Sequence, residues 1–175
     1  MKKIILLSLF IGSLFAGERL QEKLDQELPL LGHRNWIVIA DAAYPLQVAQ
    51  GVETVAVSVE MLETVQKVIS EIGKAKHLHP VIYNDSELPF VSEKNAPGIE
   101  AYRKGLEKIL KGQTTQKLPH EELIKKLDEA GKTFKILLIK TPMAKPYTSV
   151  FIQLECGYWN EASEKELREA MKIKK

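Results

Sequence analysis

Side chains suited to acid–base chemistry or directed hydrogen bonding flank the first apolar run of the sequence. Asp41 comes directly after the run WIVIA at residues 36–40. Open α/β sheets usually bind ligands at the carboxyl ends of their strands, so Asp41 is a candidate to orient a ligand hydroxyl or a histidine. The alternative is an Asx turn ahead of Pro45, and position alone does not separate the two. His33 precedes the same run, and it is either an acid–base group or a partner for carbonyls at a helix end.

Two further segments carry groups of the same kind. His120 follows a proline and precedes two glutamates, which is also the ordinary pattern of a helix start. Lys140, Tyr147 and Ser149 flank a proline-containing loop between two apolar runs. A tyrosine at the start of a strand either packs in the core or binds a ligand. The residue types alone leave both interpretations open for this loop.

Charge and composition argue against several other kinds of function. The chain has 25 Lys and Arg against 23 Asp and Glu, with no dense basic block, so nucleic-acid binding is not expected. His77 and His79 alternate but lack a third ligand at a fitting spacing, so we expect no metal and no other cofactor. The sequence holds no glycine-rich phosphate loop and no nucleophile elbow. The single cysteine, Cys156, lies in an apolar run and is expected to be buried.

Alternating helix and strand patterns predict one α/β domain. Apolar residues at spacings of three and four favour helices over 18–31, 60–76, 98–111, 120–130 and 161–173. Short apolar runs favour strands at 36–40, 53–59, 80–84, 134–140 and 148–156. This alternation is typical of a mixed or mainly parallel sheet flanked by helices.

The N-terminus resembles a secretory signal peptide. Met1-Lys2-Lys3 provides a positive start, and residues 4–16 are mostly apolar but shorter than the roughly 20 residues needed to cross a bilayer. Small residues at Ala16-Gly17 suit cleavage. We therefore expect a signal peptide over 1–17, a domain over 18–175, a periplasmic or secreted location and no membrane contact after cleavage. An uncleaved membrane anchor is the alternative.

Three segments together resemble the RbsD/FucU family of ribose pyranases and fucose mutarotases. The stretch LGHRNWIVIADAAYP resembles the family's pattern of Gly-His-x-Asp, a hydrophobic strand, then Asp-Ala and Pro. The stretch IKTPMAKPYTSVFIQLECG resembles its closing pattern of a strand, a basic residue, Pro-Tyr-Ala-Asn and a last apolar strand ending in Gly. Between them, PHEELIKKL resembles a helix start that carries a further histidine in the pyranases. The resemblance covers about residues 24–157, with an insertion at about 79–100.

The resemblance implies a monosaccharide site and roles for six residues. Of the catalytic residues, His33 would be the main acid–base histidine, Asp41 a sugar-orienting carboxylate and His120 a second polar contact. Tyr147, Ser149 and Lys140 would bind the sugar. The implied reaction is mutarotation through the open-chain aldehyde, with histidine as general acid–base and no cofactor. The implied assembly is a homo-oligomer whose sites lie at subunit contacts.

Two departures from the family pattern leave alternatives open. Asn35 replaces the acidic residue that follows the histidine, and Ser149 replaces an asparagine. The alternatives are a sugar-binding protein without catalysis and a structural oligomer of the same fold.

Overall fold

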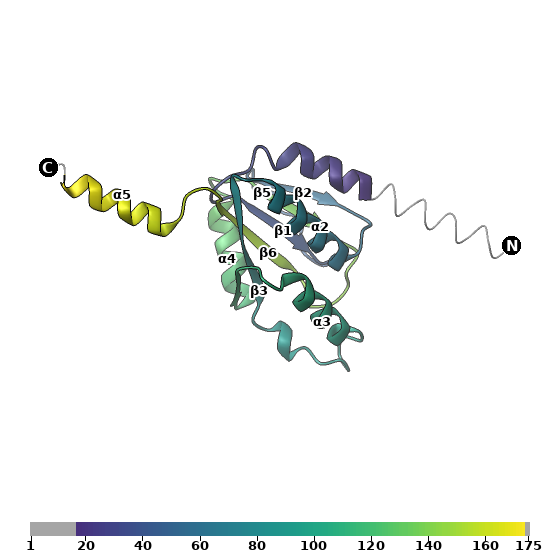
Figure 1. The fold of residues 1–175 in the computed structure, drawn as a ribbon. Helices are drawn as coiled ribbons and strands as arrows, with labels where there is room; N and C mark the ends of the chain where they lie inside the picture. Colours follow the sequence, from purple (N-terminus) through teal and green to yellow (C-terminus); the bar gives the residue numbers. More distant parts are fainter. Residues whose placement is uncertain (1–16, 174–175) are drawn as a thin grey trace.

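The computed structural model describes residues 17–173, and a six-stranded sheet forms its centre (Figure 1). The strand order is β2-β5-β1-β6-β3-β4. Only β6 runs antiparallel to its neighbours, while the paired strands β1, β2 and β5 are parallel, as are β3 and β4. The strand bounds are β1 (Trp36–Ala40), β2 (Val52–Ala56), β3 (Leu78–Asp85), β4 (Thr115–Leu118), β5 (Ile136–Lys140) and β6 (Val150–Cys156).

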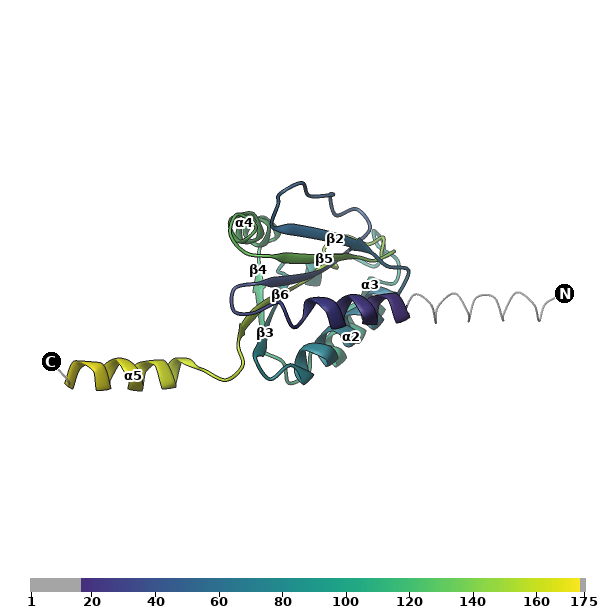
Figure 2. The same ribbon diagram turned by 90° about the horizontal axis from the view of Figure 1, so that it is seen from above.

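Helices cover both faces of this sheet (Figure 2). The N-terminal helix over residues 17–27, α2 (Met61–Lys74) and α3 (Ile99–Leu110) share one apolar cluster with one face of β1, β3 and β6. Helix α4 (His120–Ala130) packs Leu123 and Leu127 on the opposite face, one helical turn apart. A short 3-10 turn, η1 (Leu88–Phe90), precedes α3. The last helix, α5 (Glu161–Ile173), extends away from the rest of the molecule (Figure 1).

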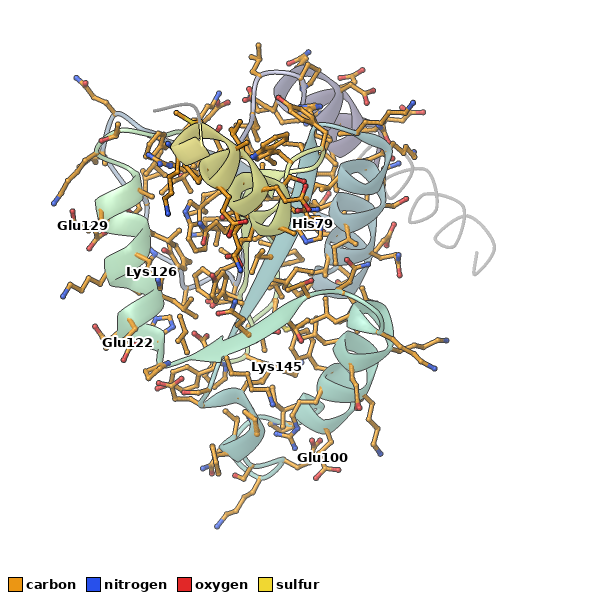
Figure 3. The ribbon with its side chains drawn as sticks, turned by 60° about the vertical axis from the view of Figure 1, so that its left-hand side comes forward. His79, Glu100, Glu122, Lys126, Glu129 and Lys145 are labelled. Carbon is orange, nitrogen blue, oxygen red and sulfur yellow. The ribbon has the colours of Figure 1, made fainter. Side chains whose placement is uncertain are left out.

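Burial explains why the central strands carry no alternating pattern. Every residue of β1 is buried, as are four of the five residues of β5, because helices lie on both faces. Helix α4 instead keeps an exposed charged surface, which carries Glu122, Lys126 and Glu129 (Figure 3). The apolar side of α4 therefore fixes the orientation of its first residue, His120.

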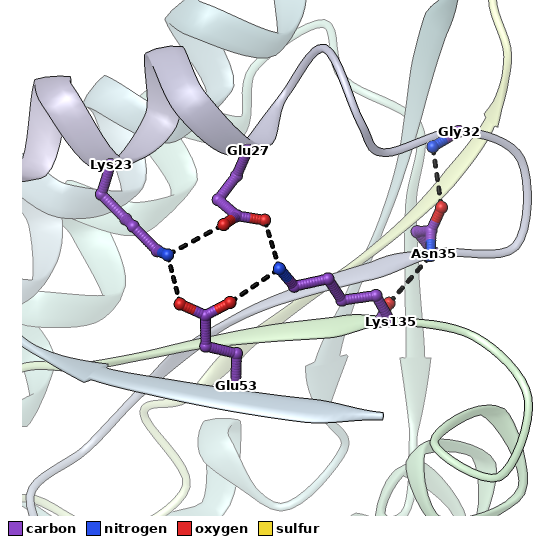
Figure 4. Close-up of polar contacts among 6 residues, drawn as sticks. All are labelled: Lys23, Glu27, Gly32, Asn35, Glu53 and Lys135. Carbon is purple, nitrogen blue, oxygen red and sulfur yellow. Dashed lines mark hydrogen bonds and ion pairs between the residues drawn. The ribbon is translucent and has the colours of Figure 1, made fainter. Parts of the chain in front are cut away.

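Four alternating charges attach the N-terminal helix to the sheet (Figure 4). Lys23 pairs with Glu27 at 2.8 Å and with Glu53, while Lys135 lies 2.6 Å from both carboxylates. Glu27 is 7% exposed, so two ammonium groups compensate for a carboxylate taken out of water. This network fixes the helix that leads into the His33 segment.

The sequence correctly predicted the fold class, a single α/β domain with a mixed sheet. The polar strand β4 was not expected, because residues 115–118 have no apolar run. Residues 79–100 contribute most of β3 and all of η1.

The predicted signal peptide lies almost entirely outside the described residues, which begin at Gly17. Within residues 17–173, no helix has the length and apolar character needed to cross a membrane.

Candidate functional site

Polar side chains from five strands or their adjoining loops gather at one edge of the sheet. Asp41 follows β1, Asp85 ends β3, and Lys140 ends β5. His120 lies two residues after β4, and Ser149 directly precedes the antiparallel strand β6. Parallel strands end at the same edge, and an antiparallel neighbour begins there, so the topology itself brings these residues together.

His120 is held by two carboxylates at the start of α4. Its ring Nδ1 lies 3.0 Å from Asp85 Oδ1, and its backbone N–H donates to Glu87 at 3.0 and 3.2 Å. The His120 side chain remains 31% exposed, whereas Asp85 is fully buried. One ring nitrogen thus contacts a buried carboxylate while the imidazole stays accessible from outside.

Burying the Asp85 carboxyl reduces the stability of the fold. Burial raises its pKa to about 6, against the opposing effect of the hydrogen bond and charge of His120, and the neighbouring charges of Glu87 and Asp41 raise it further. Its Oδ2 has no hydrogen-bond partner within the described residues. An unpartnered buried polar atom costs about 1–3 kcal/mol, so this carboxyl weakens the fold.

Asp41 and Ser149 form a closed pair. Ser149 Oγ donates to Asp41 Oδ2 at 2.9 Å and accepts from the Asp41 backbone N–H at 3.2 Å. The other carboxylate oxygen accepts from the Ala43 backbone N–H at 2.9 Å, which is the Asx turn that the sequence left open. The Ser149 side chain therefore positions Asp41.

Tyr147 projects beside His120 from a constrained loop. The two rings meet edge to face, with centroids 5.7 Å apart and planes at 82°. Tyr147 has φ of 57°, a left-handed conformation that few non-glycine residues adopt. The next residue, Thr148, accepts at its carbonyl from the buried Tyr102 hydroxyl at 2.6 Å. This anchor holds a strained, 38% exposed tyrosine over the histidine.

Lys140 lies at the same edge but is already engaged. Its Nζ donates to the Tyr44 carbonyl at 2.6 Å, which ties the loop after Asp41 to the end of β5. This contact makes Lys140 a support of the Asp41 loop in the isolated chain.

His33 lies at the opposite edge, beside the amino end of β1. Its Nδ1 is 2.6 Å from Glu155 Oε2, and Glu155 also accepts from the Gln153 side chain at 3.0 Å. The five residues of β1, at about 3.3 Å each, separate this pair from Asp41 by roughly 16 Å. The six candidate residues therefore form two groups within one chain, with His33 alone on its side.

Sequence reasoning missed both carboxylates that contact the histidines. Asp85 ends a strand that was predicted to stop at residue 84, and Glu155 belongs to an apolar run. The position of Asp85 at a strand end, like that of Asp41, was the only available signal.

A separate hollow of about 1100 Å³ opens between η1, α3 and β4. Asn84 and Asp85 belong to its lining, and Asn84 Nδ2 also lacks a partner in the described part of the chain. His120 and Tyr147 are not among the described residues that line it.

The described residues contain no cluster of three or more His, Cys, Asp or Glu side chains suited to hold a metal ion. Cys156 is a free, half-buried thiol rather than a fully buried one.

Comparison with known proteins relates this architecture to one family. The profile described as "RbsD / FucU transport protein family" matches residues 16–157. No curated protein sequence matches the chain.

Solved structures share the fold. The structure of Bacillus subtilis RbsD complexed with D-ribose is 24% identical, with a TM-score of 0.51 over 76% of this chain and 91% of that one. The fucose mutarotase of Streptococcus pneumoniae in complex with L-fucose is 20% identical, with a TM-score of 0.50 over the same shares. FucU from Bifidobacterium longum is 15% identical, with a TM-score of 0.53 over 77% of this chain and 94% of that one.

These matches correct the prediction of an exported protein. The predicted signal peptide and the predicted periplasmic or secreted location were wrong, because the chain matches the RbsD / FucU family profile and solved RbsD and fucose mutarotase structures. The profile also begins at residue 16, inside the segment assigned to the signal. A basic start followed by a short apolar run is a compositional pattern, and it was insufficient here.

The family resemblance of the three sequence segments is confirmed. The profile spans all three, and the fold places the Asp-Ala, His-Glu-Glu and Pro-Tyr segments at one sheet edge. The chain belongs to the RbsD / FucU transport protein family.

Proposed function

We propose that this protein is a monosaccharide mutarotase that opens and recloses the sugar ring at the edge formed by His120, Tyr147 and Asp41. The observation that carries the proposal is the accessible imidazole of His120, held against Asp85 and faced by Tyr147. Family membership and the sugar-bound relatives support a sugar-related function.

Mutarotation requires only two proton transfers and the breaking and re-forming of one C–O bond. The anomeric hydroxyl loses a proton, the ring oxygen gains one, and the C–O bond of the ring breaks to give the open aldehyde. Reclosure on either face exchanges the anomers. His120 is the general acid–base in this proposal, and such catalysis is typically worth about 10²–10⁴-fold. Tyr147 and Asp41 supply hydrogen bonds to the sugar hydroxyls.

A second copy of the chain completes the site in this proposal. His33 and Glu155 form an accessible acid–base pair, 50% and 33% exposed, at the edge that lacks the other candidates. One chain cannot bring His33 to His120, because β1 separates them. Contact between the two edges of different copies would unite all the catalytic candidates.

Exchange NMR on the purified protein tests the catalytic claim. We expect accelerated anomer exchange of D-ribose or L-fucose that falls at least tenfold in His120→Ala. Glu122→Ala, on the outer face of α4, is the matched control and should leave the rate unchanged (Figure 3). Unaccelerated exchange for a broad panel of aldoses would refute the mutarotase.

Mixing two inactive variants tests the shared site. If His33 and His120 act in one site from different copies, His33→Ala and His120→Ala should restore part of the activity when they are unfolded together and refolded. Unrestored exchange, with mixed assemblies verified by mass spectrometry, contradicts the shared site.

One observation favours a non-catalytic sugar-binding protein as the second candidate. The Ser149 hydroxyl and the Lys140 amine both have protein partners, which leaves fewer free groups for a transition state. Sugar line broadening without accelerated exchange would support this function over the mutarotase.

A further inference from the structure

The carboxyl of Asp85 contacts the candidate site only through His120. Its Oδ1 lies 3.0 Å from the ring Nδ1, and the side chain is fully buried. Glu87 binds the backbone N–H of the same residue, so the main chain and the ring of His120 are held independently. A sugar at the exposed edge would meet the imidazole, with Asp85 behind it.

We propose that Asp85 is the positioning residue of His120, which fixes the proton on Nδ1 and leaves Nε2 as the atom that exchanges protons with the sugar. This inference rests on the proposed function and names the reacting atom within it.

The chemistry of the pair determines the direction of the hydrogen bond. An ionised carboxylate only accepts, so a neutral His120 must carry its proton on Nδ1 to bond to it. Nε2 then holds a lone pair and acts as the base toward the anomeric hydroxyl. When Nε2 takes that proton, the adjacent carboxylate stabilises the imidazolium, which then returns a proton to the ring oxygen.

The surroundings of Asp85 bear on its charge. Glu87 beyond β3 and Asp41 beyond β1 add negative charge, and both oppose its ionisation. Tyr44 lies in the loop after β1 and Tyr102 in α3. Burial raises the pKa of each tyrosine above its ordinary value, and the negative charge of Asp85 raises it further. Arg103 and Lys117 belong to the lining of the hollow, as Asp85 does. Among the described residues, His120 Nδ1 is the group within hydrogen-bond distance of Asp85 Oδ1.

The cost of Asp85 supports a functional role. Its Oδ2 has no partner among residues 17–173 and its side chain is fully buried, a combination that a purely structural position rarely keeps. Buried carboxyls with strongly perturbed pKa values concentrate at functional sites.

The substitution Asp85→Asn tests the inference, because it keeps the shape and reverses the hydrogen bond. The amide can donate to Nδ1, which favours the proton on Nε2. We expect ¹⁵N NMR to show the Nδ1–H tautomer of His120 in the unsubstituted protein and the Nε2–H tautomer in Asp85→Asn. Anomer exchange at saturating sugar should fall about 10²–10⁴-fold, with little change in KM.

Two further variants make the test specific. Asp85→Ala removes the acceptor without adding a donor and should give a mixture of tautomers. Asp128→Asn changes an exposed acid of α4 and should alter neither tautomer nor rate. An unchanged His120 tautomer in both Asp85 variants would overturn the inference. If no aldose shows accelerated exchange, the mutarotase proposal fails instead, and the tautomer measurement still tests the role of Asp85.

Discussion

Replacing Asp85 by asparagine should stabilise the protein while it impairs His120. The pKa of Asp85 rises from 3.8 to about 6 on folding, chiefly through burial. A carboxyl with a raised folded pKa binds its proton more tightly in the native state. The protein therefore loses stability as pH rises from about 4 to about 6, and the loss is complete above that range. Asparagine cannot ionise, so Asp85→Asn escapes this loss.

The size of the effect follows from the shift. About 2.2 pKa units (6 minus 3.8), at 1.36 kcal/mol each, give an upper bound of about 3 kcal/mol. The burial of Asp85 argues against a large reduction by solvent screening. We expect Asp85→Asn to match the unsubstituted protein near pH 3.5 and to exceed it by up to about 3 kcal/mol at pH 8.

Urea unfolding followed by circular dichroism, at half-unit steps from pH 3.5 to pH 8, measures this difference. The exposed-acid variant Asp128→Asn should show a difference that stays near zero throughout. The reasoning is wrong if Asp85→Asn is less stable than the unsubstituted protein at pH 8, or if its advantage does not grow between pH 4 and pH 6. If Asp85 serves function at the expense of stability, Asp85→Asn should be more stable than the unsubstituted protein and should exchange anomers more slowly.

Three other substitutions follow from particular contacts. Glu155→Gln removes the charge beside His33, and it should slow anomer exchange at least tenfold by NMR without changing the urea midpoint. Gly157→Ala places a Cβ 2.5 Å from a backbone oxygen, and it should destabilise the fold by about 1–3 kcal/mol in urea. Lys135→Met leaves the buried Glu27 carboxylate with one cation, and should cost about 1–3 kcal/mol at pH 7. Because both lysines outweigh burial and lower the pKa of Glu27, that cost should shrink as the pH of the urea series falls below 4.5.

The sequence predicted best those helices and strands whose buried faces determine where their apolar residues fall. Strand β1 was predicted with its observed bounds, because a strand covered on both faces is apolar throughout. Helix α4 was also predicted with its observed bounds, because its apolar spacing matches one buried side. Strand β4 was missed because an exposed edge strand gains its stability from the ladder to β3, which leaves no trace in its own side chains.

The Asp85–His120 pair shows why the carboxylate partner of His120 could not be predicted from the sequence. The two residues belong to different elements, and only the parallel pairing of β3 with β4 brings their ends together. Asp41 was found because it follows a buried strand within a recognised pattern. Asp85 ends a less regular strand, so its position carried no comparable signal.

His33 shows how a departure from a family pattern can mislead. Asn35 has no charge, which left His33 without an acidic partner as far as the sequence could show. In the folded chain, Asn35 instead accepts from Gly32 and donates to the Lys135 carbonyl, which shapes the loop. The carboxylate beside His33 comes from Glu155, because antiparallel β6 ends where β1 begins. The loss of an acid at position 35 therefore does not imply an unsupported histidine, since strand pairing supplies another carboxylate from the far end of the domain.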